Sequence, residues 1–135
     1  ATVQTETFTE RAKALLAYFN EHNFQFAAPT LIKYEMAAVT RKWVYRELVT
    51  ADEAEAAFKA LLEIPIELFF DQKLLQRGYA LAAELNRPTA YDSQYLAVAE
   101  HLECDFWTVD ERFFNAVNEQ FPSIKWIGNW EPESE

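Results

Sequence analysis

Three acidic residues stand beside stretches of the sequence that should be buried: Glu35, Asp92 and Asp110. Glu35 has apolar residues one helical turn away on both sides. Asp92 and Asp110 stand at the two ends of an expected helix–strand segment. A buried carboxylate without a counter-charge is costly, and a bound cation removes that cost. Because oxygen ligands favour Mg²⁺ or Mn²⁺ over Zn²⁺, these residues predict a site for a hard divalent cation.

Each of these acids also has an ordinary structural explanation, and the residues alone leave both explanations open. Glu35 can lie at the edge of an apolar helix face and reach water. Thr89 and Asp92 fit the capping-box pattern at the start of a helix. Asp110 precedes ERFF, and aspartate is a preferred helix N-cap. The case for a metal site therefore depends on the three acids converging in space.

Helical and strand-like patterns alternate along the chain, which indicates an α/β fold with a parallel sheet covered by helices on both faces. In such folds ligands bind beyond the carboxyl ends of the strands, and Asp110 directly follows a predicted strand. The predicted strands are 24–28, 64–70, 105–109 and 124–128. The predicted helices begin near Thr7, Thr30, Thr50, Asp71, Thr89 and Asp110, and four of them end near residues 48, 86, 102 and 120.

Composition restricts the class of protein. The chain has 135 residues, of which half are hydrophobic, so it predicts one globular domain. The sequence shows no segment that could span a membrane and no signal peptide, and its single cysteine, Cys104, makes a cytoplasmic location the default. Neither His22 nor His101 has a metal-binding partner at helical spacing. The net charge of −10 disfavours nucleic-acid binding through basic residues alone.

The motifs around the three acids resemble the PIN-domain family. Glu35 stands in APTLIKYEMAAVTRK, Asp92 in TAYDSQYLAVAE and Asp110 in WTVDERF. Residues 8–128 are most similar to the VapC-like toxin ribonucleases of type II toxin–antitoxin systems. The resemblance implies a three-layer α/β/α fold with a central parallel sheet. It also implies hydrolysis of RNA phosphodiester bonds with Mg²⁺ or Mn²⁺.

The resemblance assigns roles to individual residues. Glu35, Asp92 and Asp110 would be metal ligands, and Thr108 would orient a carboxylate or a coordinated water. The basic residues near these acids are candidates for contacts with RNA phosphates, although ordinary salt bridges on a solvated face explain them as well. These residues are Arg41, Lys42, Arg87 and Arg112. The family also implies a cognate antitoxin protein as partner and a homodimer.

The sequence departs from the family at its N-terminus. Family members begin with a central strand that carries a metal-binding aspartate, whereas ATVQTET contains no aspartate. This difference predicts that residues 1–135 form one PIN-like domain that lacks its N-terminal strand, and that the natural protein has a preceding segment. Residues 129–135 are expected to be an acidic tail. Ala38 stands where relatives often carry asparagine.

Two other classes of function compete with the ribonuclease. The missing aspartate, the acidic charge and the four tryptophans fit a catalytically degenerate PIN-like module that binds another protein. A small-molecule α/β enzyme is poorly supported, because two glycines cannot build a glycine-rich phosphate loop.

Overall fold

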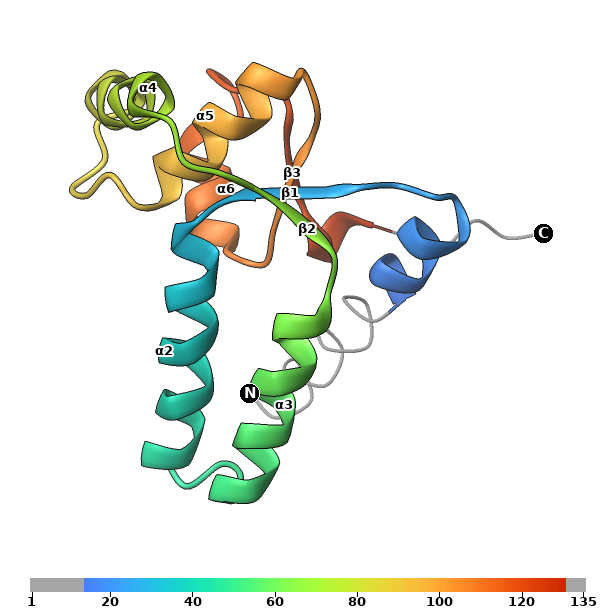
Figure 1. Ribbon diagram of the computed structural model, residues 1–135. Coiled ribbons are helices and arrows are strands. Elements are labelled where there is room, and N and C mark those ends of the chain that lie inside the picture. Colours follow the sequence, from blue (N-terminus) through green and yellow to red (C-terminus); the bar gives the residue numbers. More distant parts are fainter. Residues whose placement is uncertain (1–13, 131–135) are drawn as a thin grey trace. The chain divides into compact units, whose positions relative to one another are not determined.

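The computed structural model describes residues 14–130 and shows a mixed α/β protein with parallel strands (Figure 1). The expected α/β class is confirmed. The chain divides into two compact units, which are taken in turn. The second unit is Phe26–Asp71, and the first unit comprises residues 14–25 and 72–130 of the described part. The expected capping box at Thr7 and the last residues of the expected acidic tail, 131–135, lie outside the described residues.

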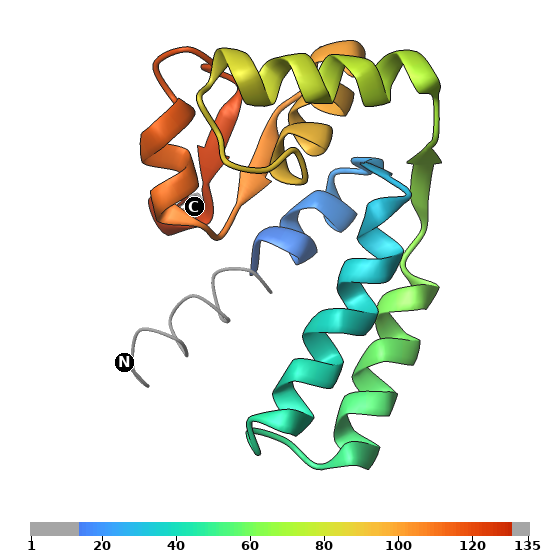
Figure 2. The ribbon, with the colours of Figure 1, turned by 90° about the vertical axis from the view of Figure 1, so that its left-hand side faces the viewer.

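The second unit is a parallel strand pair connected through a helical hairpin. Its elements are β1 (Phe26–Pro29), α2 (Leu31–Tyr45), α3 (Ala51–Glu63) and β2 (Ile66–Phe69). Phe26 pairs with Ile66, and Pro29 pairs with Phe69. The helices α2 and α3 lie side by side (Figure 2). Parallel strands need such a crossover, because a tight turn can only join antiparallel strands.

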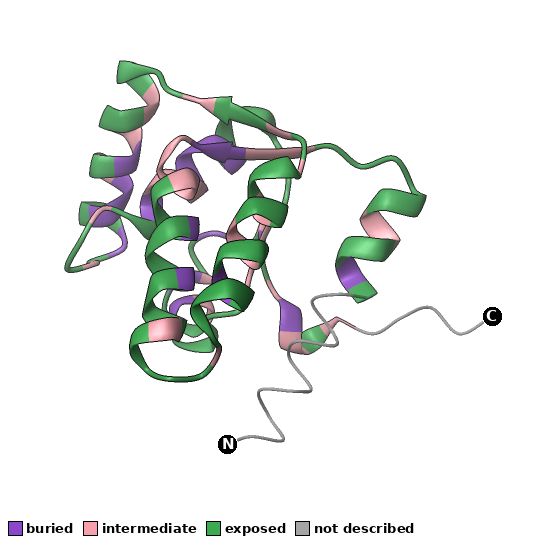
Figure 3. Ribbon diagram, turned by 60° about the horizontal axis from the view of Figure 1, so that its bottom comes forward, coloured by how far each residue is buried: buried purple, intermediate pink, exposed green. Residues whose placement is uncertain are grey.

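Local sequence signals explain where the hairpin helices begin and end. The capping box predicted at Thr50 is confirmed, since Thr50 Oγ1 accepts a hydrogen bond from Glu53 N at 3.1 Å and Glu53 Oε1 accepts one from Thr50 N at 3.1 Å. The helix α2 ends at Tyr45, earlier than the expected Leu48, because Glu47 adopts a left-handed backbone with φ of 58°. Most of the surface of α2 and α3 is exposed (Figure 3).

The first unit contains helix 14–21 and most of the apolar core. Its further elements are α4 (Gln72–Glu84), α5 (Asp92–Leu102), β3 (Phe106–Thr108), α6 (Glu111–Val117), β4 (Ile124–Trp126) and the 3₁₀ turn η1 (Ile127–Asn129). The strands β3 and β4 are parallel, and Thr108 pairs with Trp126. The core consists of Leu81, Leu85, Leu96, Ala97, Phe113, Val117, Phe121 and Ile124.

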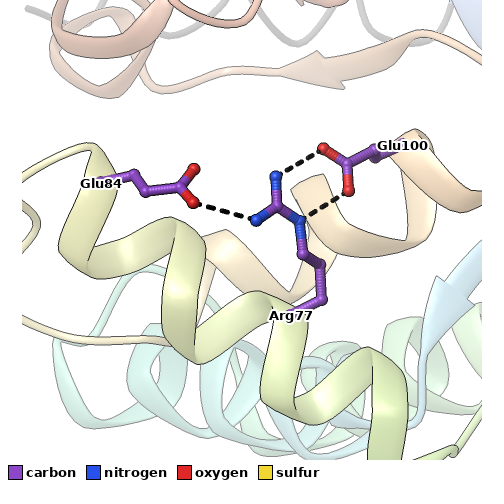
Figure 4. A network of polar contacts seen from close by, with 3 residues as sticks. All are labelled: Arg77, Glu84 and Glu100. Atoms are coloured by element: carbon purple, nitrogen blue, oxygen red, sulfur yellow. Dashed lines mark hydrogen bonds and ion pairs between the residues drawn. The ribbon is translucent and has the colours of Figure 1, made fainter.

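The helices α4 and α5 pack closely on one another. The buried Gly78 on α4 leaves room for the end of the Gln94 side chain of α5, which lies 2.6 Å from where a Cβ atom would stand. Arg77 on α4 links the two helices through an ion pair with Glu100 on α5 (Figure 4). Its guanidinium donates to Glu100 Oε1 at 2.7 Å and Oε2 at 2.9 Å, and to Glu84 Oε1 at 3.0 Å.

In residues 14–130 no helix is both long and apolar enough to cross a membrane. The described strands form two separate two-stranded pairs, β1–β2 and β3–β4.

Candidate metal centre

Asp110 stands at the carboxyl end of β3, where it caps α6. Its backbone is extended, and Asp110 Oδ1 accepts a hydrogen bond from Phe113 N at 3.0 Å. The predicted N-cap is therefore confirmed. Thr108 Oγ1 accepts a hydrogen bond from Asp110 N at 3.0 Å, so the Thr108 hydroxyl fixes the Asp110 backbone. These two bonds hold the carboxylate at the end of the strand, where parallel folds bind ligands.

Asp92 is the first residue of α5, and its predicted capping box is not formed. The helix begins at Asp92 with Tyr91 as N-cap, and Tyr91 makes no capping hydrogen bond with its side chain. The expected start at Thr89 was wrong because residues 89 and 90 do not belong to the helix. Among residues 14–130 the Asp92 carboxylate has no hydrogen bond or salt bridge. The capping explanation for Asp92 is thereby removed, although its charge still suits the first turn of α5, whereas the N-cap explanation for Asp110 holds.

The two aspartates lie close enough to influence each other. Although the Asp92 side chain reaches solvent, partial burial of its carboxylate raises the pKa of Asp92, and the negative charge of Asp110 raises it further. The charge of Arg87 acts in the opposite direction and lowers the pKa of Asp92. A cation bound to both carboxylates would cancel their repulsion and favour the ionised form of each.

Ser93 is a member of this neighbourhood that the sequence did not reveal. It follows Asp92 in the first turn of α5 and is 1% exposed. Its Oγ atom is buried and has no hydrogen-bond partner among residues 14–130. An unsatisfied buried hydroxyl costs about 1–3 kcal/mol, and such groups often mark functional sites. In the sequence, only its position beside Asp92 pointed to Ser93, because no residue pattern predicts that a buried hydroxyl lacks a hydrogen-bond partner.

Of the predicted phosphate-binding residues, Arg87 and Arg112 lie in the first unit. The guanidinium carbon of Arg87 stands 5.2 Å from the centroid of the Phe113 ring, a cation–π contact that positions Arg87 near Asp92. Arg112 is exposed on α6, two residues after Asp110. Arg87 therefore lies near Asp92, whereas no contact among the described residues places the Arg112 side chain at the two aspartates.

Glu35, Arg41 and Lys42 are exposed on α2, which belongs to the second unit. The side chains of α2 that are buried are Met36 and Thr40, so Glu35 is not on the buried face of the helix. Within the described ranges no three acidic, histidine or cysteine side chains form a group that could hold a metal ion. That Glu35 joins Asp92 and Asp110 stays a prediction.

The donor set at Asp92 and Asp110 fits a hard cation. Mg²⁺ is commonly bound by one or two carboxylates, with waters and substrate phosphates completing its octahedron. Two neighbouring carboxylates, one without a protein partner among the described residues, meet this requirement. Ser93, the residue after Asp92, carries a further buried hydroxyl. Compared with protein-family models, curated proteins and solved structures, the chain matches none of them.

Proposed function

We propose that this chain is a metal-dependent endoribonuclease whose ion is held by Asp92 and Asp110. The observation that carries the proposal is the proximity of two carboxylates at the end of β3, where the charge of one raises the pKa of the other. A capping hydrogen bond accounts for Asp110, whereas the Asp92 carboxylate makes no hydrogen bond or salt bridge among residues 14–130. A cation bound by both carboxylates would explain why two negative charges lie close together.

The residues around the pair suit hydrolysis of a phosphodiester. A bound Mg²⁺ or Mn²⁺ supplies a nucleophilic water at neutral pH and positive charge for the scissile phosphate. Thr108 already accepts a hydrogen bond from Asp110 N, so its own proton is left to donate. Arg87 and Arg112 offer positive charge to the phosphates on either side of the cleaved bond. No nucleophilic side chain is required.

The finer features of the proposal come from the resemblance to PIN domains. The two parallel pairs and the helices that connect their strands are compatible with an α/β fold, and the three-layer arrangement around one central sheet stays a prediction from the resemblance. The resemblance adds Glu35 as a third ligand, a cognate antitoxin as partner and a homodimer. We include these features in the proposal as predictions.

A second candidate, a protein-binding module without catalysis, is favoured by the exposed aromatic residues of the second unit. Tyr34 is 75% exposed, Tyr45 is 81% exposed and Phe70 is 85% exposed. Large exposed aromatic side chains are typical of protein interfaces. The two candidates differ in one measurable property, because only the ribonuclease needs the metal.

Titration calorimetry with Mn²⁺ and cleavage of a labelled single-stranded RNA test the proposal together. Asp92→Asn and Asp110→Asn should each lower metal affinity and reduce cleavage by about 100-fold or more. Asparagine is as good an N-cap as aspartate, so Asp110→Asn removes the charge and keeps the start of α6. Glu119→Gln, an exposed acid near the end of the same helix, is the matched control and should behave like wild type.

The outcomes separate the candidates. Metal binding and cleavage that are both lost in the two variants support the ribonuclease. If wild type binds no Mn²⁺ at about millimolar concentration and cleaves nothing, the chain is better explained as a binding module. If both variants cleave as well as wild type, Asp92 and Asp110 are not the metal ligands.

A further inference from the structure

An aromatic pocket on the first unit is not used by the proposed chemistry. It is an open hollow with a volume of about 350 Å³. Its walls include three aromatic rings, from Trp107 on β3, Phe114 on α6 and Trp126 on β4. All three side chains are half-buried, so each keeps part of its ring surface open. Flat apolar walls of this kind suit a flat aromatic ligand.

The rim of the pocket carries polar groups that are not engaged by the rest of the described chain. The side-chain amides of Asn118 and Asn129 make no hydrogen bond to another described residue. Lys125 is exposed, and its ammonium forms no salt bridge with a described residue. An amide both donates and accepts hydrogen bonds, as the edge of a nucleobase does, and an ammonium binds phosphate. The aromatic rings, the amides and the ammonium therefore suit the flat base, the polar base edge and the phosphate of a nucleotide, respectively.

The two indole walls are held in place before any ligand arrives. Trp126 Nε1 donates to Val109 O at 3.3 Å. The Trp126 ring also lies against Gly128, where a Cβ atom would overlap the ring carbon Cζ2. The ring of Trp107 is supported edge-on by Phe19 of helix 14–21, with 6.2 Å between their centroids. Because the two indole rings are already held in place, little side-chain conformational entropy is lost when a ligand binds to them.

The pocket lies near Asp110 along the chain. Trp107 and Asp110 are three residues apart, so their Cα atoms are separated by no more than about 11 Å. The hydrogen bond from Trp126 ends on Val109, the residue directly before Asp110. One strand end therefore carries both an aromatic wall of the pocket and a ligand of the candidate metal centre.

We propose that the pocket formed by Trp107, Phe114 and Trp126 stacks a base of single-stranded RNA while Lys125 binds an adjacent phosphate. The proposal rests on the ribonuclease function and deepens it, because it names the part of the substrate that is held beside the cleaved bond. Stacking on aromatic side chains is how proteins grip single-stranded nucleic acid with little dependence on sequence. It also offers the acidic chain an affinity that does not depend on many basic residues.

Binding can be measured apart from cleavage. The probe is fluorescein-labelled hexauridylate RNA, followed by fluorescence anisotropy with the full chain in EDTA, so that no metal is present. Trp107→Leu should raise Kd by about 5-fold to 100-fold through the loss of one stacking wall. Lys125→Gln should lower the slope of log K against log salt by about 0.7, the value for one phosphate contact on a single strand. Asn129→Asp, at the exposed rim, should also weaken binding.

Matched controls use the same changes outside the pocket. Lys59→Gln removes an exposed lysine on α3, and Asn115→Asp adds the same charge on the exposed part of α6. Both should bind like wild type. If Trp107→Leu does not fold, the two rim variants still decide the matter, because Lys125 and Asn129 are exposed and their replacement leaves the core intact.

The results distinguish this proposal from the ribonuclease proposal. If the pocket variants lose RNA binding while Asp92→Asn binds normally and fails to cleave, both proposals hold. If the pocket binds RNA but wild type cleaves nothing with Mg²⁺ or Mn²⁺, the pocket survives and the nuclease fails. The pocket proposal is overturned if wild type does not bind the RNA, or if pocket variants and controls bind it equally well.

Discussion

At the level of single residues, the two aspartates of the candidate centre differ in how far the fold alone explains their positions. Asp110 caps α6, so it would be expected in this position even without a ligand. Asp92 opens α5 without a hydrogen bond among the described residues, and burial and Asp110 raise its pKa. An ionised group kept in an unfavourable environment is more informative about function than one with a structural role. Asp92 is thus the better residue with which to test the site.

Asp92→Asn should make the metal-free protein slightly more stable at pH 7. A raised folded-state pKa means that the folded protein binds more protons than the unfolded chain just above the ordinary pKa of 3.8. Stability is therefore lost as the pH rises through this window, and the variant avoids that loss. The gain should stay below about 1 kcal/mol, because the side chain is partly exposed and the dipole of α5 favours its charge.

Urea denaturation in EDTA at about pH 3 and at pH 7 measures this effect. The difference between variant and wild type should be larger at pH 7 than at the lower pH. Glu119→Gln provides the comparison for a general loss of negative charge. If Asp92→Asn destabilises the protein at pH 7, the carboxylate has a stabilising partner and the argument that Asp92 serves as a metal ligand fails.

Two residues show what the sequence could and could not reveal about the site. The position of Asp110 was predictable, because a strand pattern followed by an aspartate and an amphipathic stretch marks both a strand end and an N-cap. That the buried hydroxyl of Ser93 finds no partner in the described part of the chain was not predictable. Whether a buried hydroxyl finds an acceptor depends on the packing of neighbouring elements, which no local pattern records.

At the level of elements, the type of each segment could be predicted better than its limits. The strand expected over 105–109 is confirmed as Phe106–Thr108, and the one expected over 64–70 is confirmed as Ile66–Phe69. The capping pattern was right at Thr50 and wrong at Thr89. The side chain of a Thr-x-x-acid motif can cap only if the threonine backbone is extended where the helix begins, and tertiary packing decides that.

The Arg77 network should contribute to the attachment of α4 to α5 in a pH-dependent way. Arg77 lowers the pKa of Glu100, so the contribution is present above the ordinary value of 4.5 and is lost as the pH falls through the lower folded value. Arg77→Met should cost about 0.5–1 kcal/mol at pH 7, since the bidentate bond is strong but the groups are partly exposed.

Urea denaturation at pH 7 and at about pH 3 checks the sign of this dependence. The cost of Arg77→Met should be smaller at the lower pH, because protonation of Glu100 as the pH falls removes the charge that Arg77 binds. Lys59→Met breaks an exposed pair with Glu55, whose side chains are 72% and 62% accessible, and should have almost no effect at either pH. An equal cost of Arg77→Met at both pH values would assign its effect to packing rather than to charge.

At the level of the whole molecule, the charge of −10 limits how the chain can bind RNA. Non-specific affinity for phosphates grows with the number of cationic contacts, and an acidic protein has few to offer. In the proposed mode of binding, a metal ion and a stacking pocket take the place of these cationic contacts. RNA binding should accordingly depend weakly on salt compared with that of a basic nuclease.

The two units should also differ in stability. The large side chains that are almost fully buried, Phe113, Leu96, Ile124 and Val117, all belong to the first unit. The buried apolar side chains described in the second unit are those of Ala28, Pro29, Met36 and Ala54. Since buried apolar area is the main favourable term in folding, the second unit should open more easily.

Native-state hydrogen exchange, read by mass spectrometry at low urea concentrations, resolves the two units within one sample. Amides of α2 and α3 should exchange with an opening free energy at least about 2 kcal/mol below that of α5 and β4. Every peptide serves as a control for the others, because pH and temperature are shared. Equal opening free energies with equal urea dependence in both units would mean that the chain unfolds as one cooperative body. In that case, contacts other than the core of the first unit would have to hold the helical hairpin in place.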